Sequence, residues 1–185
     1  MTTDYKIGKG IKRLIQESNA HVKPESHLAI EVLELLTSLY FLRQPFRESN
    51  DLIENLRALH LMRLLQDDIA LRLCKFTDDD TRSWSFEQAH KKIRKRNGNE
   101  DTTKQYLALR DQYRDAMRPI EEHRNSYIAH RSKRDRAHLK PLDFREATRL
   151  AVEIVDVFAG QRCSYLLNNI DLRREILGDW NSAPA

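Results

Sequence analysis

The chain contains little glycine and proline, with five of each among 185 residues, whereas leucine, arginine, glutamate, alanine and lysine are abundant. Because glycine and proline disfavour helix interiors and the abundant residues favour them, this composition indicates a helical protein. No apolar run reaches the roughly eighteen residues that span a bilayer, and the N-terminus lacks the apolar stretch of a secretory signal. We therefore expect no membrane segment and a cytoplasmic location.

Cysteine is equally scarce. Cys74 and Cys163 lie far apart in the sequence on predicted apolar helix faces, which favours two reduced core thiols over a disulfide or a reactive thiol. Neither has a histidine close by, so they predict no structural zinc site. The acidic run at residues 78–80 lacks the glycine and the ligand spacing of a calcium loop. We therefore expect neither a metal nor a cofactor.

The net charge is only +4, but the positive charge is concentrated in two clusters, at residues 91–96 and 131–140. Such clusters attract phosphate backbones without sequence preference. A solvated helix face and a solvated loop are the alternative interpretations. The candidate RNA-binding residues are Lys91, Lys92 and Arg94 in the first cluster, and Arg131, Lys133 and Arg134 in the second.

Apolar residues recur at three- and four-residue spacing along most of the chain, which predicts helices. We expect a weak helix at about residues 4–18 and a buried one from Pro24 to the Gln44-Pro45 break. Further helices are expected from a cap at Ser49 or Asn50 to about residue 76, over about 85–96, and from Thr102 or Thr103 onward.

Two further features set expected helix boundaries. Pro119 either kinks the fifth helix or begins a new one. Asp143 and Glu146 form a capping-box pair for the last long helix, whose buried stripe is expected to include Tyr165 and Leu166.

No internal repeat, no convincing strand and no dividing linker is evident in the sequence. The prediction is an all-α protein, an antiparallel helical bundle of about five to six helices. We expect residues 1–178 to form a single domain, with residues 1–20 as a peripheral N-terminal helix and residues 179–185 as a flexible tail.

The most informative stretch is residues 123–130, His-Arg-Asn-Ser-Tyr-Ile-Ala-His. It combines a permanent cation, a short amide and a titratable imidazole within about two helical turns. Arginine presents a planar fork to phosphate oxygens, and histidine exchanges a proton near neutral pH. Other Arg–His pairs with similar spacing occur, but the fuller string Arg-Asn-x-x-x-Ala-His occurs once, from Arg124 to His130.

In this form the segment resembles the HEPN superfamily, in the branch found in bacterial abortive-infection and toxin–antitoxin systems. Arg124 matches the motif arginine, Asn125 the polar residue that often follows it, and His130 the motif histidine. The resemblance implies a helical bundle that dimerises and brings two copies of the motif together. Many members of the superfamily are metal-independent ribonucleases.

The resemblance further implies RNA transphosphorylation, with RNA, a second copy of the chain and a cognate antitoxin as partners. His130 would take a proton from a ribose 2′-hydroxyl or protonate the leaving 5′-oxygen. Arg124 would stabilise the charge on the phosphorane oxygens. Asn125 would hold the phosphate or the motif backbone by hydrogen bonds.

Geometry restricts how the motif can work. Positions six apart on a straight helix point about 120° away from each other. Either the helix is distorted after Pro119, or Arg124 and His130 of different subunits complete the site. His123 and His130 are about 10 Å apart along a helix axis, too far to bind one metal ion.

Three alternatives to a ribonuclease remain at this stage. The first is a non-catalytic HEPN-like module that binds RNA, a nucleotide or a partner protein through the same cleft. The second is a purely structural bundle whose residues 91–96 bind nucleic acid. In the third, the motif is ordinary packing, with His130 hydrogen-bonded to a backbone carbonyl.

Overall fold

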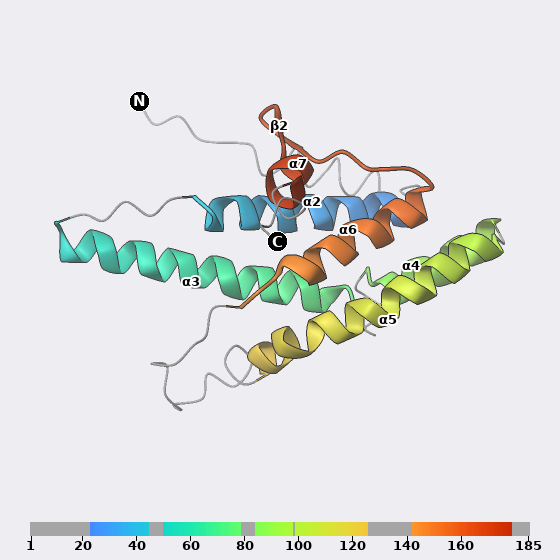
Figure 1. Cartoon of the computed structure of the whole chain (residues 1–185), viewed down its shortest axis with the longest axis horizontal. Helices are drawn as coiled ribbons and strands as arrows, with labels where there is room; N and C mark the ends of the chain where they lie inside the picture. The colour runs from blue at the N-terminus through green and yellow to red at the C-terminus, as the bar shows by residue number, and fades with distance from the viewer. Residues whose placement is uncertain (1–22, 45–49, 79–83, 98, 126–141, 179–185) are drawn as a thin grey trace, which may run out of the picture.

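The computed structural model describes residues 23–44, 50–78, 84–97, 99–125 and 142–178. These residues form six helices and one short hairpin, which confirms the all-α prediction (Figure 1). The expected helix at 4–18 and the expected tail at 179–185 lie outside the described residues. The elements are α2 (Pro24–Leu42), α3 (Leu52–Lys75), α4 (Phe86–Asn97), α5 (Glu100–His123), α6 (Arg145–Ala159), β1 (Leu166–Leu167), β2 (Ile170–Asp171) and α7 (Leu172–Leu177).

Helix α6 is the most deeply buried element and packs against both α5 and α2. Its buried residues, which include Leu150, Ile154 and Phe158, occupy most of its surface. Gly160 ends the helix with φ +67°, a left-handed conformation that glycine adopts without steric cost. Helices α2, α3 and α5 pack around α6 and complete the core.

Helix α2 begins at Pro24, as predicted, with proline in the first helical turn. Leu28, Val32 and Leu35 are among its buried residues, but Ile30 and Phe41 are exposed. Several neighbouring helices thus bury α2, as expected, but not on all sides. One face of α2 remains open because α3, α6 and α7 pack against the others.

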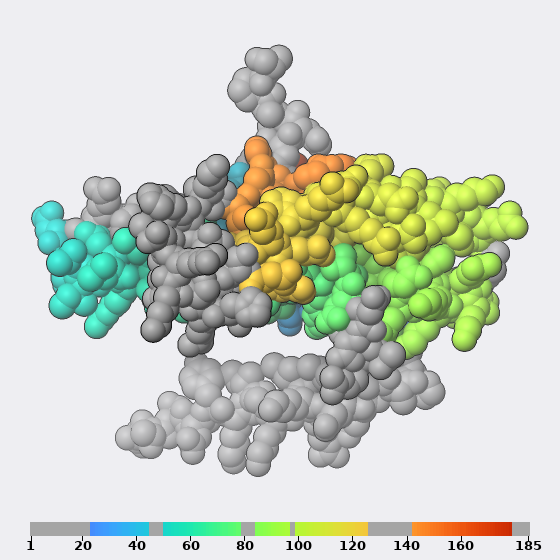
Figure 2. Space-filling model, turned by 90° about the horizontal axis from the view of Figure 1, so that it is seen from below, coloured from blue at the N-terminus to red at the C-terminus, as the bar shows by residue number. Residues whose placement is uncertain are grey.

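Helix α3 begins after Asp51, whose carboxylate accepts a hydrogen bond from the Ile53 amide at 2.8 Å. The N-cap is thus Asp51 and not Ser49 or Asn50. In the C-terminal half of α3 the core residues are Ile69, Ala70, Leu73 and Cys74. The N-terminal half extends beyond α5 (Figure 2), and its apolar residues Leu52, Ile53, Leu56 and Leu59 are 56–70% exposed. The helix itself was predicted correctly.

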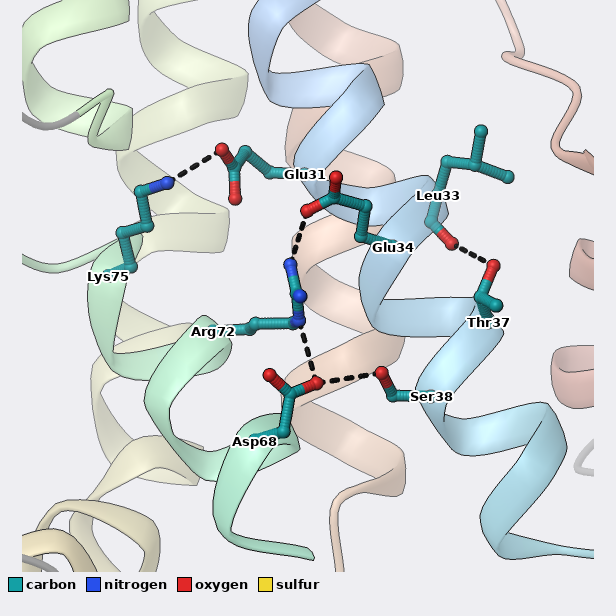
Figure 3. A network of polar contacts seen from close by, with 8 residues as sticks. All are labelled: Glu31, Leu33, Glu34, Thr37, Ser38, Asp68, Arg72 and Lys75. Carbon is teal, nitrogen blue, oxygen red and sulfur yellow. Dashed lines mark hydrogen bonds and ion pairs between the residues drawn. The ribbon is translucent and has the colours of Figure 1, made fainter. Parts of the chain in front are cut away.

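A polar network joins α2 to α3 (Figure 3). Arg72 binds Asp68 at 2.8 Å and also Glu34 of α2, while Ser38 of α2 donates to Asp68 at 2.7 Å. Lys75 pairs with Glu31 at 2.6 Å one turn further along. These contacts fix one face of α3 against α2, and α5 packs against α3 as well.

Helix α5 begins at Glu100, earlier than Thr102 or Thr103, because Asn99 caps it. The Asn99 side chain accepts hydrogen bonds from the amides of Asp101, at 2.9 Å, and Thr102. The helix continues through Pro119 to His123, so Pro119 does not begin a new helix.

The start and end of α6 also differ from the predictions. Phe144 is the N-cap residue and makes no side-chain cap, so Asp143 and Glu146 form no capping box. Asp143 instead accepts from the Arg145 amide at 3.0 Å, and its ion pair with the Arg145 guanidinium lowers the pKa of its carboxyl. Tyr165 and Leu166 lie beyond the end of the helix.

The residues after α6 form a hairpin and a short helix that the sequence analysis did not predict. Asn168 and Asn169 have φ of 47° and 70° in the two-residue turn between β1 and β2. Consecutive positive φ values are the requirement of a tight hairpin turn, and asparagine tolerates them. Asp171 then caps α7 by accepting from the Arg174 amide.

Both cysteines are free thiols; Cys74 is buried, and Cys163 lies beyond the end of α6 and is only partly buried. None of the described helices combines the length and the apolar character that crossing a bilayer requires.

Candidate functional site

The predicted motif begins where α5 ends. Arg124 and Asn125 directly follow His123 and continue the chain in a wider, π-type turn. The regular α-helical geometry therefore stops at His123, before the end of the motif. His130, Arg131, Lys133 and Arg134 lie outside the described residues.

The guanidinium of Arg124 is oriented by its neighbour. Its Nε donates a hydrogen bond to Oδ1 of Asn125 at 3.1 Å. This bond uses Nε, so the terminal nitrogens of the fork remain as further donors. In the described part of the chain no carboxylate pairs with Arg124, whereas Arg72 and Arg149 each bind two. Arg124 is thus a half-buried cation without a counter-ion among the described residues.

Cys74 of α3 lies next to Arg124. Burial raises the pKa of the Cys74 thiol to about 11, and the Arg124 guanidinium acts in the opposite direction. The thiol is therefore protonated at neutral pH and is a poor nucleophile. The thiol interacts with the Arg124 side chain, including by a hydrogen bond.

His123, immediately before Arg124, is buried and contacts α3. Its Nε2 lies 3.3 Å from Oδ1 of Asp67, and the two side chains are 9% and 32% exposed. From the sequence, His123 was rejected as a metal ligand, and no signal pointed to Asp67, which is 56 positions away.

Two more contacts hold the C-terminal half of α5 on α3. The hydroxyl of Tyr113 donates to the Leu73 carbonyl at 2.7 Å, and Thr77 donates to Glu121 at 3.4 Å. Burial raises the pKa of Tyr113 well above its ordinary value. The turn that contains Arg124 therefore follows a helix end that three side-chain contacts, from Tyr113, Glu121 and His123, hold against α3 and the turn after it.

The basic residues of α4 lie at the other end of α5 (Figure 1). Helix α5 has 24 residues, which corresponds to about 35 Å at 1.5 Å per residue. Nζ of Lys91 lies 4.0 Å from Oε1 of Glu87, and Nζ of Lys92 lies 3.9 Å from the centre of the Trp84 ring. Arg94 lines a pocket near the start of α5. The structure thus does not bring Lys91, Lys92 and Arg94 close to Arg124.

The exposed half of α3 lies next to the motif. Leu52, Leu56 and Leu59 share a helix face with Asp67 and Cys74, at spacings of three, four, seven and eight residues. From Asp67 to Cys74 this face contacts α5 and Arg124. Because α5 ends at His123, no described helix covers the same face further toward the N-terminus.

The comparisons with known proteins concern the family. Residues 16–170 match the model of the AbiU2 family of HEPN proteins, HEPN_AbiU2. The match spans α2 to α6 and most of the chain. No curated protein and no solved structure matches the chain.

Proposed function

The chain belongs to the HEPN superfamily, in its abortive-infection-type AbiU2 branch, and on this basis we propose that it is a metal-independent endoribonuclease acting as a toxin or antiphage effector. The observation that carries the proposal is the Arg124 guanidinium, oriented by Asn125 and without a carboxylate partner in the described part of the chain. A guanidinium in this state is suited to bind the scissile phosphate.

The proposed reaction uses the substrate's own nucleophile. The His130 imidazole removes the proton from a ribose 2′-hydroxyl, and the resulting oxygen attacks the adjacent phosphorus. The bond to the 5′-oxygen breaks, and a protonated imidazole returns a proton to this leaving group. The terminal nitrogens of Arg124 stabilise the charge on the non-bridging oxygens. Because the nucleophile is a 2′-hydroxyl, the substrate is RNA and not DNA.

We place Asn125 in a positioning role. Its carbonyl oxygen accepts from Nε of Arg124 at 3.1 Å, so it restricts the rotation of the guanidinium plane. A fixed plane reduces the conformational entropy that Arg124 loses when it binds phosphate. This contact is to the Arg124 side chain, and so it differs from both roles considered in the sequence analysis, holding the phosphate or holding the motif backbone.

We further propose that the active form is a homodimer. The exposed face of α3 around Leu52, Leu56 and Leu59 adjoins the motif. In a two-fold dimer identical patches meet each other. Burial of this face against a second copy would remove its apolar surface from water. It would also bring two motifs close together, so that Arg124 and His130 of different subunits can complete one site.

The RNA beyond the scissile phosphate would contact the basic clusters. Arg131, Lys133 and Arg134 follow His130 directly in the sequence and are proposed to bind the adjoining phosphates. Lys91, Lys92 and Arg94 lie too far from Arg124 in one chain to act on the same phosphate. A cognate antitoxin is the proposed protein partner that keeps the activity in check.

The test is cleavage of bulk RNA by purified full-length protein in EDTA. The wild-type protein is expected to degrade RNA, whereas Arg124→Ala and His130→Ala lose cleavage by at least about 100-fold, typical for loss of one catalytic group. Arg118→Ala is the matched control, because Arg118 is on the same helix and forms only an exposed pair with Asp115.

The non-catalytic alternative makes the opposite prediction. If wild-type protein leaves RNA intact while Arg124→Ala weakens RNA association in a filter-binding assay, the chain is a binding module. Unchanged cleavage and unchanged growth inhibition in His130→Ala would refute the ribonuclease proposal. Circular dichroism on each variant confirms that the helical fold is kept.

A further inference from the structure

A second candidate site lies at the opposite end of α5 from the motif. A pocket of about 380 Å³ opens between the start of α2, the end of α4, the start of α5 and the end of α6. This volume is within the range of small-molecule sites. The pocket contains no residue of the Arg124–His130 motif.

One side of the pocket is cationic. Lys23, Arg94 and Arg96 line it, and Arg96 pairs with Glu25 at 2.8 Å. Three cations and one carboxylate leave an excess of two positive charges. Lys23 is also the N-cap residue of α2 and provides no side-chain cap for it, so the positive end of that helix adds to the field.

The other side of the pocket offers hydrogen-bond acceptors. The last residues of α6, up to Ala159 and Gly160, line it, and the carbonyls at a helix C-terminus carry partial negative charge. One carboxylate oxygen of Glu25 is buried and has no hydrogen-bond partner. An anion alone would leave these acceptors without donors.

The floor between the two sides is apolar and rigid. Ile93 and Phe158 line the pocket and are each 5% exposed. His90 lies beside them, stacked against Phe158 and 3.4 Å from the Thr103 hydroxyl. The cations therefore line a cavity with an apolar floor, and they differ in this from a flat basic surface.

We propose that this pocket binds a small sugar phosphate, either free or as part of a mononucleotide. The phosphate is bound by Lys23 and Arg94, and the sugar hydroxyls donate to the acceptors at the α6 end. Neither an inorganic anion nor an uncharged sugar satisfies both sides. The proposal does not depend on the ribonuclease function, because it uses none of the motif residues.

The experiment is isothermal titration calorimetry of the full-length chain with ribose 5-phosphate at low ionic strength. Saturable binding is expected, with one ligand per chain. Arg94→Gln and Lys23→Gln are each expected to weaken binding by about tenfold, the loss of one charge-assisted contact. Lys95→Gln is the matched control, since Lys95 is exposed on the same helix and does not line the pocket. Arg124→Ala is expected to leave binding unchanged.

Four further ligands distinguish the chemistry. Ribose and inorganic phosphate are expected to bind far more weakly than ribose 5-phosphate. Uridine 5′-monophosphate binding more tightly than ribose 5-phosphate identifies the mononucleotide as the source, and the reverse order identifies the free sugar phosphate. A single-stranded RNA that binds through Arg94 while ribose 5-phosphate does not would overturn the proposal and assign the surface to RNA. Absence of ribose 5-phosphate binding, or equal binding by wild type, Lys23→Gln and Arg94→Gln, would also overturn it.

Discussion

The contact between His123 and Asp67 joins the residue before Arg124 to a different helix. A half-buried, charge-assisted contact of this kind contributes on the order of 1 kcal/mol after allowance for solvent screening. Its position makes it more than a general stabiliser. Because His123 directly precedes Arg124, holding the His123 side chain against α3 also fixes the position at which the Arg124 backbone starts.

We expect Asp67→Asn to lower the free energy of unfolding by about 1 kcal/mol, because the amide keeps the shape of the carboxylate but removes its charge. Urea unfolding followed by circular dichroism measures this change. Asp115→Asn removes an exposed partner of Arg118 and is expected to change stability by less than about 0.5 kcal/mol. Equal effects of the two substitutions would contradict the importance of the buried contact.

The buried thiol of Cys74 predicts a loss of stability at alkaline pH. Burial raises its pKa to about 11 in the folded chain, above the value of 9.0 for an unperturbed thiol. Between these pH values the unfolded chain releases the thiol proton and the folded chain keeps it, so stability falls as pH rises. The expected loss between pH 9 and pH 10 is about 1 kcal/mol.

Urea midpoints at pH 7.5, 9 and 10 measure this dependence, and Cys74→Ala is the comparison. The variant starts from a lower stability because of its smaller side chain, but its decline between pH 9 and pH 10 should be smaller than that of the wild type. An identical decline in both proteins would assign the effect to other groups, such as the buried tyrosines.

The candidate site residues were proposed from neighbouring positions in the sequence. Arg124, Asn125 and His130 form one local string, and the hydrogen bond between Arg124 and Asn125 joins adjacent residues. Asp67 could not be identified, because helical periodicity predicts which face a residue occupies but not which residue of another helix it meets.

At the scale of single helices, the polar network between α2 and α3 holds α3, the helix against which the end of α5 packs, in place. Arg72 bridges Glu34 and Asp68, and Asp68 also accepts from Ser38 (Figure 3). The bonds to Asp68 and Glu34 raise the pKa of Arg72. A cation shared by two carboxylates has a stronger effect than isolated surface pairs, because its removal leaves two like charges close together.

Arg72→Met keeps most of the aliphatic volume and removes the charge. We expect it to lower the free energy of unfolding by about 1–2 kcal/mol, a central value for breaking a partly buried network. Arg118→Met, at an exposed pair, should cost less than about 0.5 kcal/mol. Thermal and urea unfolding of both variants would show the difference; similar values would mean that the network adds nothing beyond surface pairing.

Helix identity was more predictable than helix ends. The apolar spacing located α2 to α6, but the N-caps of α3 and α5 are Asp51 and Asn99 and not the residues that we expected. Several adjacent residues can cap a helix, and the choice depends on where tertiary packing allows the backbone to leave the helix. The hairpin at Asn168 and Asn169 was missed because two-residue strands have no alternation to detect.

At the scale of the whole molecule, the exposed apolar half of α3 predicts self-association. Leu56→Asp introduces a charge into the face that adjoins the motif. If that face is the dimer interface, the substitution should weaken dimerisation by at least about 100-fold, because it buries an unpaired charge. Size-exclusion chromatography with light scattering over a range of concentrations measures the equilibrium.

Leu61→Asp is the matched control, because Leu61 is equally exposed but lies on the opposite side of α3 from Leu52. It should leave the dimer intact. A wild-type chain that stays monomeric at high concentration, or a dimer that responds equally to both substitutions, would contradict the assigned interface. The RNA-cleavage assay on Leu56→Asp then reports whether the site needs two subunits.

The distance between residues 91–96 and the start of the motif could not be predicted at this scale. Residues 91–96 precede the motif by about thirty positions in the sequence, a separation that is compatible with any distance in a compact bundle. One continuous α5, which runs through Pro119, separates residues 91–96 from Arg124.

Pro119 itself has a mechanical consequence. Proline has no amide hydrogen, so the carbonyl of Asp115, one turn earlier, loses its helical donor. The terminal turn of α5 is therefore coupled to the preceding turns by one main-chain bond fewer, close to the point where Arg124 begins. Bending at this joint therefore requires less work than elsewhere in α5, and the contacts of Tyr113 and Thr77 described above are what hold the turn in place.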